Sequence, residues 1–263
     1  MRVALTIAGS DSSGGAGIQA DLKTFAALGV YGTSAITAVT AQSTVGVMES
    51  LALAADLVTA QIEAVAGDIE IHATKTGMLA DAAIVEAVAA AIKALELPFV
   101  VVDPVMAATG GDRLLDDDGV QMLIRELLPL AHVVTPNIPE AEALSGRRIA
   151  SRDDAHEAAR RIQGMGPAAV IITGGHGPDP GESTDLLFDG EHFSIFRTPR
   201  VTTPNTHGTG CTFAASVAAH LALGQGIAAA AERSQQYVAG AIRHRLGIGR
   251  GHGALDHFWK ERI

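Results

Sequence analysis

Short apolar runs alternate along the chain with longer segments in which apolar residues recur every three or four positions. The run at residues 3–8, VALTIA, ends before Gly9 and is typical of a buried strand, whereas residues 81–95 have the spacing of a helix. The two patterns together predict strands at residues 3–8, 34–40, 72–75, 99–102, 132–135 and 169–173, and helices at 18–28, 57–65, 81–95, 119–128 and 153–165. This alternation predicts an α/β fold with a doubly wound, mostly parallel sheet flanked by helices.

The pattern changes in the last third of the chain. Residues 183–188 and 192–197 flank Asp189-Gly190, a dipeptide that favours a tight turn, so we expect a small β-hairpin in the C-terminal part. Two alanine-rich segments, 211–223 and 227–246, predict the last helices. Because no linker-like segment or internal repeat interrupts the chain, we interpret residues 1–263 as one domain.

Composition narrows the class of protein. Of the 263 residues, 48% are hydrophobic and 18% are charged, which is enough apolar material for a large core. The net charge of −10 argues against a nucleic-acid binder, which needs clustered basic side chains. No run approaches the roughly 18 apolar residues of a membrane-spanning helix. The single cysteine, Cys211, excludes an intrachain disulfide and fits a reducing compartment, so we expect a cytoplasmic protein.

A glycine- and serine-rich segment follows the first predicted strand and reads GSDSSGGAG from Gly9 to Gly17. Its end matches the Ala-ending form of the dinucleotide fingerprint, but that match begins only at Gly15. No acid closes the second strand, which leads to Gln42, and no Gly-Lys-Ser/Thr follows to make a Walker A loop. Two interpretations remain, a flexible strand-to-helix turn and a loop that approaches a ligand closely.

Polar residues also follow the later strands, at the edge where open α/β sheets bind ligands. Asp103 comes directly after residues 99–102, and Asn137 and Glu140 come after residues 132–135. These residues fit Mg²⁺, which prefers few carboxylates together with waters and phosphate oxygens. An equally good interpretation is structural, with Asn137 capping the next helix and Glu140 in its first turn.

The strongest single signal is the sequence NTHGTGCT at residues 205–212, directly before an apolar helix. Gly208 and Gly210 allow the backbone N–H groups to point toward one place, and the helix N-terminus adds partial positive charge, so an anion site is expected. Cys211 stands at that terminus, where the pKa of a thiol tends to fall. The alternative is that Cys211 is only a small buried residue in a tight turn.

These motifs resemble the ribokinase-like superfamily and, within it, the hydroxymethylpyrimidine/phosphomethylpyrimidine kinase family of thiamine biosynthesis. The similarity extends along nearly the whole chain and keeps one order. The segments that carry it are AGSDSSGGAGIQADLK (8–23), TAQ (40–42), KTGML (75–79), DPVM (103–106), TPN (135–137), PEAEAL (139–144) and NTHGTGCT (205–212).

The resemblance implies a homodimeric kinase that uses ATP and Mg²⁺ without a Walker loop. It would phosphorylate 4-amino-5-hydroxymethyl-2-methylpyrimidine and then the resulting monophosphate. The site residues that it implies are Gln42, Gly9, Asp21, Met78 and Val105 for the substrate; Asp103, Asn137, Thr173, Gly175 and His207 for ATP; Asp103 and Glu140 for the metal; and Gly208, Thr209, Gly210 and Cys211 for catalysis. Cys211 holds the position at which most ribokinase relatives carry an aspartate base.

Two departures from the family pattern remove positive charge near the phosphates. Thr173 precedes Gly174-Gly175-His176 where relatives commonly carry lysine, and residues 107–111, including Ala108, lack another common lysine. Three other activities remain open. They are a pyridoxal kinase of the same superfamily, a thiol hydrolase that uses Cys211 with His207, and a dinucleotide-dependent oxidoreductase that rests on the glycine match alone.

Overall fold

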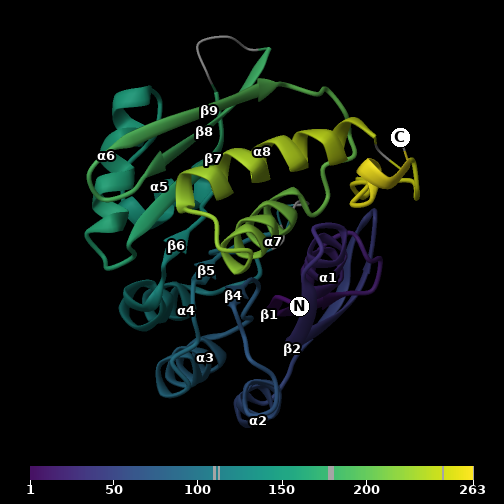
Figure 1. Cartoon of the computed structure of the whole chain (residues 1–263), viewed down its shortest axis with the longest axis vertical. Coiled ribbons are helices and arrows are strands. Elements are labelled where there is room, and N and C mark those ends of the chain that lie inside the picture. Colours follow the sequence, from purple (N-terminus) through teal and green to yellow (C-terminus); the bar gives the residue numbers. More distant parts are fainter. Residues whose placement is uncertain (109–110, 112, 177–180, 245, 263) are drawn as a thin grey trace.

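A computed structural model describes residues 1–108, 111, 113–176, 181–244 and 246–262 of the chain (Figure 1). Nine strands in these residues form one sheet in the order β3-β2-β1-β4-β5-β6-β7-β8-β9. The strands are β1 Val3–Asp11, β2 Tyr31–Ser43, β3 Gly46–Ala52, β4 Ala73–Thr76, β5 Val100–Val102, β6 Val133–Val134, β7 Ala169–His176, β8 Glu182–Phe188 and β9 Phe193–Pro199. The α-helices are α1 Gly17–Ala27, α2 Ala55–Ala66, α3 Ala82–Ala94, α4 Asp117–Met122, α5 Ile138–Ser145, α6 Arg152–Gln163, α7 Thr209–Ala222 and α8 Ile227–Arg243.

The centre of the sheet is parallel and both edges are antiparallel. Strands β2, β1, β4, β5, β6 and β7 pair in parallel, whereas β3 joins β2, and β8 and β9 extend from β7, in antiparallel register. The doubly wound sheet and the C-terminal hairpin that the sequence predicts are therefore confirmed. The chain leaves β1 toward β2 and β3 and returns to β4 on the other side of β1, which makes a topological switch point.

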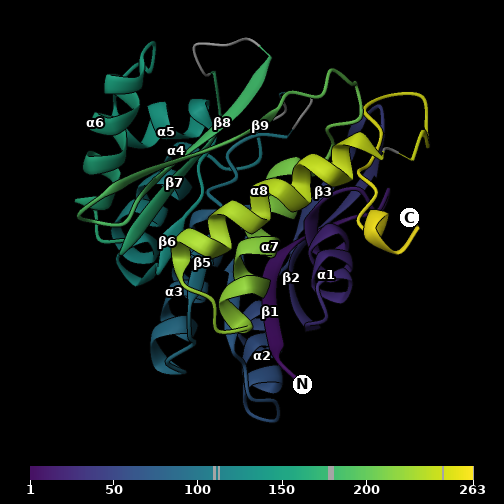
Figure 2. The ribbon, with the colours of Figure 1, turned by 45° about the horizontal axis from the view of Figure 1, so that its top comes forward.

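Alternate residues of the central strands pack into two cores, one on each face of the sheet. In β5, Val100 and Val102 face one core and Val101 faces the other, as the two-residue period of a strand requires. Helices α2 to α6 cover the first face, while α1, α7 and α8 cover the second (Figures 1 and 2). No helix in these described ranges combines the length and apolar character needed to cross a bilayer.

Three local features differ from the sequence prediction. Strand β3 has no counterpart in it, because five of its seven residues are exposed and the apolar pattern of a core strand is absent. Helix α5 is not among the helices predicted from periodicity, because its eight residues are too few to show a repeating apolar pattern. The helix predicted at 119–128 is interrupted, since α4 ends at Met122 and continues as a π-helical turn, Leu123–Leu127, and a 3₁₀ turn, Leu128–Leu130. Pro129 lies in that last turn and has no N–H to continue an α-helix.

Candidate active site

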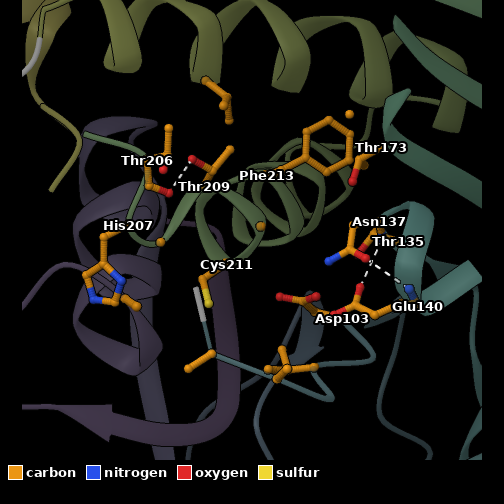
Figure 3. A pocket seen from close by; sticks show the side chains of 18 of the residues that line it. Asp103, Thr135, Asn137, Glu140, Thr173, Thr206, His207, Thr209, Cys211 and Phe213 are labelled. Atoms are coloured by element: carbon orange, nitrogen blue, oxygen red, sulfur yellow. Dashed lines mark hydrogen bonds between the residues drawn. The ribbon is translucent and has the colours of Figure 1, made fainter. Parts of the chain in front are cut away.

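A cavity of about 1070 Å³ opens at the carboxyl ends of the parallel strands, where this class of sheet binds ligands. Its lining comes from the ends of β1, β2, β4 and β7, from the residues after β5 and β6, and from the loop that starts α7 (Figure 3). Side chains of β8, β9 and α8 complete it. Predicted site residues that line it are Gly9, Gln42, Met78, Asp103, Val105, Asn137, Glu140, Thr173, His207, Gly208, Thr209, Gly210 and Cys211. Residues far apart in the sequence are therefore brought to one place, with β1 and β4 at one end of the cavity and β6 and β7 at the other.

The carboxylate of Asp11 organises the end of the cavity near the switch point. It accepts hydrogen bonds from the N–H groups of Ser13, at 2.8 Å, and Ala16, at 2.8 Å, and lies 2.8 Å from Nε2 of His207. Burial acts to raise the pKa of Asp11, but these hydrogen bonds outweigh it and hold the pKa well below its usual range. The glycine-rich loop thus donates to a carboxylate of its own chain rather than toward a dinucleotide. Sequence reasoning missed Asp11, although an acid that ends a buried strand before Ser and Gly residues is a signal for such a turn.

Three substrate residues of the resemblance meet beside this loop. Gly9 leaves room for Met78, because a Cβ at Gly9 would lie 2.5 Å from the terminal methyl of Met78. The side-chain amide of Gln42 has one end 3.0 Å from Oγ1 of Thr40 and the other 3.4 Å from Nε2 of His207. An amide held beside an apolar wall suits a flat heterocycle that carries polar ring atoms.

The expectation that Asp21 lines the substrate pocket is wrong, because its side chain is fully buried beneath the cavity. Asp21 accepts hydrogen bonds from Lys75 Nζ, at 2.9 Å, and Thr6 Oγ1, at 2.6 Å. Lys75 is also fully buried, lines the cavity floor and lies 4.0 Å from Asp103. Sequence reasoning missed Lys75; a lysine inside a buried strand is the signal, since such a charge needs a partner.

Asp103 and Glu140 place two carboxyl groups in the cavity wall opposite the start of α7 (Figure 3). Burial raises the pKa of Asp103 to about 6 against the attraction of Lys75, and burial together with the Asp103 charge raises the pKa of Glu140 to about 8. Oδ2 of Asp103 has no hydrogen-bond partner among the described residues. Two buried carboxyl groups that resist ionisation together, one with an unpartnered oxygen, are a setting in which a cation is favourable.

Asn137 and Glu140 also form a capping box at the start of α5. The N–H of Glu140 donates to Oδ1 of Asn137 at 3.0 Å, and the N–H of Asn137 donates to Oε2 of Glu140 at 2.9 Å. The capping interpretation is therefore confirmed, and the backbone of Met106 also hydrogen bonds to the Glu140 carboxyl group. No group of three or more His, Cys, Asp or Glu side chains suited to a metal occurs in the described part of the chain.

The glycine loop before α7 takes a conformation that requires glycine. Gly208 is the N-cap with φ of 81°, and a Cβ there would lie 1.9 Å from the carbonyl oxygen of Gly15. Among the described residues the N–H groups of Gly210 and Cys211 have no backbone partner, as expected at a helix start. Thr209 differs, because both its N–H and its hydroxyl donate to the carbonyl of Thr206. The N–H groups available for an anion at this helix start are therefore those of Gly210 and Cys211.

The side chain of Cys211 points toward the cavity beside Asp103 (Figure 3). Burial raises the pKa of its thiol to about 12, and the nearby ammonium of Lys75 only partly opposes this. The lowered pKa expected from the helix N-terminus is therefore wrong, because desolvation of the thiolate outweighs the helix dipole and Lys75. With His207 bound to Asp11, neither a thiolate nor a free imidazole base is in place for a thiol hydrolase.

The structure separates the residues that the resemblance assigns to ATP. Asp103, Asn137 and Thr173 lie together near the ends of β5, β6 and β7, whereas His207 lies at the opposite side of Cys211 with the glycine-rich loop (Figure 3). The expectation that His207 binds ATP with them is therefore not supported by its position. Gly175 pairs with Thr184 inside the sheet. Of the segment that lacks a lysine, Thr109 and Gly110 lie outside the described residues.

A ribokinase-like fold, a helix N-terminus that offers free N–H groups and carboxyl groups across the cavity define the class, a small-molecule kinase without a Walker loop. The family model for phosphomethylpyrimidine kinase matches residues 11–256, and the chain belongs to that family. A hydroxymethylpyrimidine/phosphomethylpyrimidine kinase from Bacillus subtilis is 51% identical over 97% of this chain and 94% of its own length.

Solved structures agree with this placement. A phosphomethylpyrimidine kinase from Clostridium difficile superposes with a TM-score of 0.82 at 42% identity, covering 92% of this chain and all of the other. A pyridoxal kinase from Bacillus subtilis, solved as an ADP complex, superposes with a TM-score of 0.92 at 39% identity over the whole of both chains. The two kinases share one architecture, so the overall fold does not distinguish their substrates.

Proposed function

We propose that this chain transfers phosphate from ATP to the hydroxymethyl group of 4-amino-5-hydroxymethyl-2-methylpyrimidine, and then to the monophosphate so formed. The observation that carries the proposal is the order of groups along one cavity. Gln42 lies beside His207 at the switch-point end. The start of α7 lies in the middle, and Asp103 and Asn137 lie at the far end (Figure 3). A heterocycle beside Gln42 would direct its alcohol toward the anion site, with the nucleotide approaching from the other side.

The free N–H groups of Gly210 and Cys211 would stabilise negative charge on the phosphoryl group during transfer. Phosphoryl transfer depends mainly on positioning and on charge stabilisation, so fixed donors at a helix N-terminus are well suited to it. We assign the catalytic role of Cys211 to its N–H rather than to its thiol, which is protonated at neutral pH. Gly208 sets the conformation of the loop, and Thr209 holds it closed onto Thr206.

Mg²⁺ would be held by the carboxyl groups of Asp103 and Glu140, and when bound it would neutralise charge on the triphosphate. Support comes from the raised pKa values of both carboxyl groups and the unpartnered oxygen of Asp103. Asn137 and Thr173 would contact the nucleotide beside them, with Thr173 offering a hydroxyl where a charge is common in relatives.

We also propose that the chain is a cytoplasmic homodimer. Strands β2 and β3 expose apolar side chains side by side, with Val39 paired to Leu51, which is 67% exposed, and Met48 86% exposed. Apolar side chains at a sheet edge favour association with another copy. Light scattering after size-exclusion chromatography tests the dimer, and a Met48→Lys variant should lower its mass if this edge forms the interface.

Pyridoxal is the second candidate substrate, because a pyridoxal kinase shares this architecture over the whole of both chains. Incubation with ATP and Mg²⁺, with either the aminopyrimidine alcohol or pyridoxal, and mass analysis of the products distinguishes the two. The proposal requires a gain of one and then two phosphates on the pyrimidine. Phosphorylation of pyridoxal alone, or of neither compound, would overturn it.

A further inference from the structure

The side-chain amide of Gln42 lies between Thr40 and His207, and these two groups determine which end of the amide is the oxygen and which is the nitrogen. Its Oε1 lies 3.0 Å from Thr40 Oγ1, and its Nε2 lies 3.4 Å from His207 Nε2. A half-turn of the amide exchanges these two atoms without changing its shape, so hydrogen bonding alone decides between the two orientations.

His207 is a hydrogen donor at this point whatever its charge. Its Nε2 lies 2.8 Å from Oδ2 of Asp11, a carboxylate that hydrogen bonds keep ionised, so a proton must stand between them. The ring is nearly buried and is packed against Gly15, at which a Cβ would lie 2.5 Å from the imidazole Cδ2. An amide nitrogen facing Nε2 would therefore set one N–H against another, whereas an amide oxygen would face a donor.

Thr40 favours the same half-turned orientation at the other end of the amide. Its hydroxyl has one hydrogen and lies 2.9 Å from the carbonyl oxygen of Ser10, which can only accept. When Thr40 donates this hydrogen to Ser10, its oxygen can only accept from Gln42, and the amide nitrogen is the end that can donate to it. In the half-turned orientation an amide N–H donates to the Thr40 oxygen, and the amide oxygen shares the hydrogen that Nε2 of His207 donates to Asp11. In the alternative orientation an amide N–H faces a nitrogen that has no free lone pair, and Gln42 competes with Ser10 for the one hydrogen of Thr40.

We propose that Thr40 and the Asp11–His207 pair are positioning residues that hold the Gln42 amide with its nitrogen toward Thr40 and its oxygen toward His207. This rests on the proposed function and names the feature of the substrate that is recognised. The amide then offers its second hydrogen and its second lone pair to the cavity in a fixed order.

The matching ligand edge is an amidine, a ring nitrogen that accepts beside an amino group that donates, with the amino group on the His207 side. A 4-aminopyrimidine has this edge. Its 4-oxo analogue presents N–H and C=O in the reverse order, and in pyridoxal the ring nitrogen and hydroxyl are separated by a methyl-bearing carbon. A locked amide would reject both.

The test compares kcat/KM for 4-amino-5-hydroxymethyl-2-methylpyrimidine with that for its 4-oxo analogue. Wild type should prefer the amino compound by roughly 100-fold or more, because a reversed edge leaves buried polar groups unpaired. Thr40→Val and His207→Phe each remove one end of the lock, and each should reduce this preference by about tenfold or more, mainly through KM. Thr40→Ser keeps the hydroxyl and should keep the preference.

Thr33→Val is the matched control, since Thr33 in the same strand also donates its hydroxyl to a carbonyl of β1, at Ala4, but outside the cavity. Its preference should equal that of wild type. An unchanged preference in both Thr40→Val and His207→Phe, with melting temperatures that show folded proteins, would overturn the inference while leaving the proposed activity intact. Failure of wild type to phosphorylate the aminopyrimidine would overturn the proposed function itself, and the inference with it.

Discussion

Replacement of Lys75 by methionine should destabilise the protein strongly, because it leaves buried carboxylates without their counter-charge. Both Lys75 and Asp21 are inaccessible to solvent, and they are joined by a hydrogen bond of 2.9 Å. Removal of one partner from a buried pair costs roughly 3–5 kcal/mol. For a protein of this size that corresponds to a decrease of about 6–20 °C in melting temperature.

The destabilisation should depend on pH with a definite sign. Burial raises the pKa of Asp21 above its ordinary value, and in Lys75→Met the opposing attraction of the ammonium is gone. The folded variant then retains a proton that the unfolded chain releases near pH 4, so acidification stabilises the folded form. The deficit relative to wild type should therefore be smaller at about pH 5 than at pH 8, and should grow as the pH rises through the folded-state pKa.

Denaturant unfolding at both pH values, with thermal melts, measures the effect. Lys93→Met removes an exposed lysine from the last turn of α3 and should change stability by no more than about 0.5 kcal/mol. The double variant Lys75→Met/Asp21→Asn should regain part of the lost stability, because Asp21→Asn removes the carboxylate that Lys75→Met leaves unpaired. A deficit below about 1 kcal/mol, or one equal at both pH values, would refute this account of the buried pair.

Three further predictions concern the cavity. Gln42→Ala should raise the KM for the pyrimidine by about 5- to 150-fold, since polar ring atoms lose a partner worth roughly 1–3 kcal/mol. An unchanged KM would exclude its proposed role. Glu140→Gln can keep the capping box, so the free energy of unfolding should change by about 1 kcal/mol or less. Activity should collapse and the Mg²⁺ requirement should shift. Full activity would remove Glu140 from the metal site. Cys211→Ala keeps the backbone N–H and removes only a thiol that is protonated in the wild type. Separate assays should therefore show similar losses in both phosphorylations, each well below the roughly 10²–10⁴-fold of a lost general base. A loss of that size in the alcohol step alone would indicate that the thiol acts as the base.

The sequence by itself determined the parts of the fold that rest on periodicity and turn chemistry. The apolar strands, the amphipathic helices and the Asp189-Gly190 turn each leave a local pattern, and the structure has the sheet and hairpin that they predict. Motif order was sufficient to indicate the family, and the position after each strand indicated most of the cavity lining. Strand β3 left no such pattern, because it packs at an exposed edge rather than in a core.

Only the tertiary structure decided the electrostatics of the site, because burial and charge pairing depend on neighbours distant in the chain. Lys75 and Asp21 are 54 residues apart, and Asp11 and His207 are 196 apart, so no local spacing reveals either pair. The same cause reversed the expectation for Cys211. A helix N-terminus is visible in sequence and favours the thiolate, but the desolvation that raises the thiol pKa exists only once β4, β5 and α7 have packed around it.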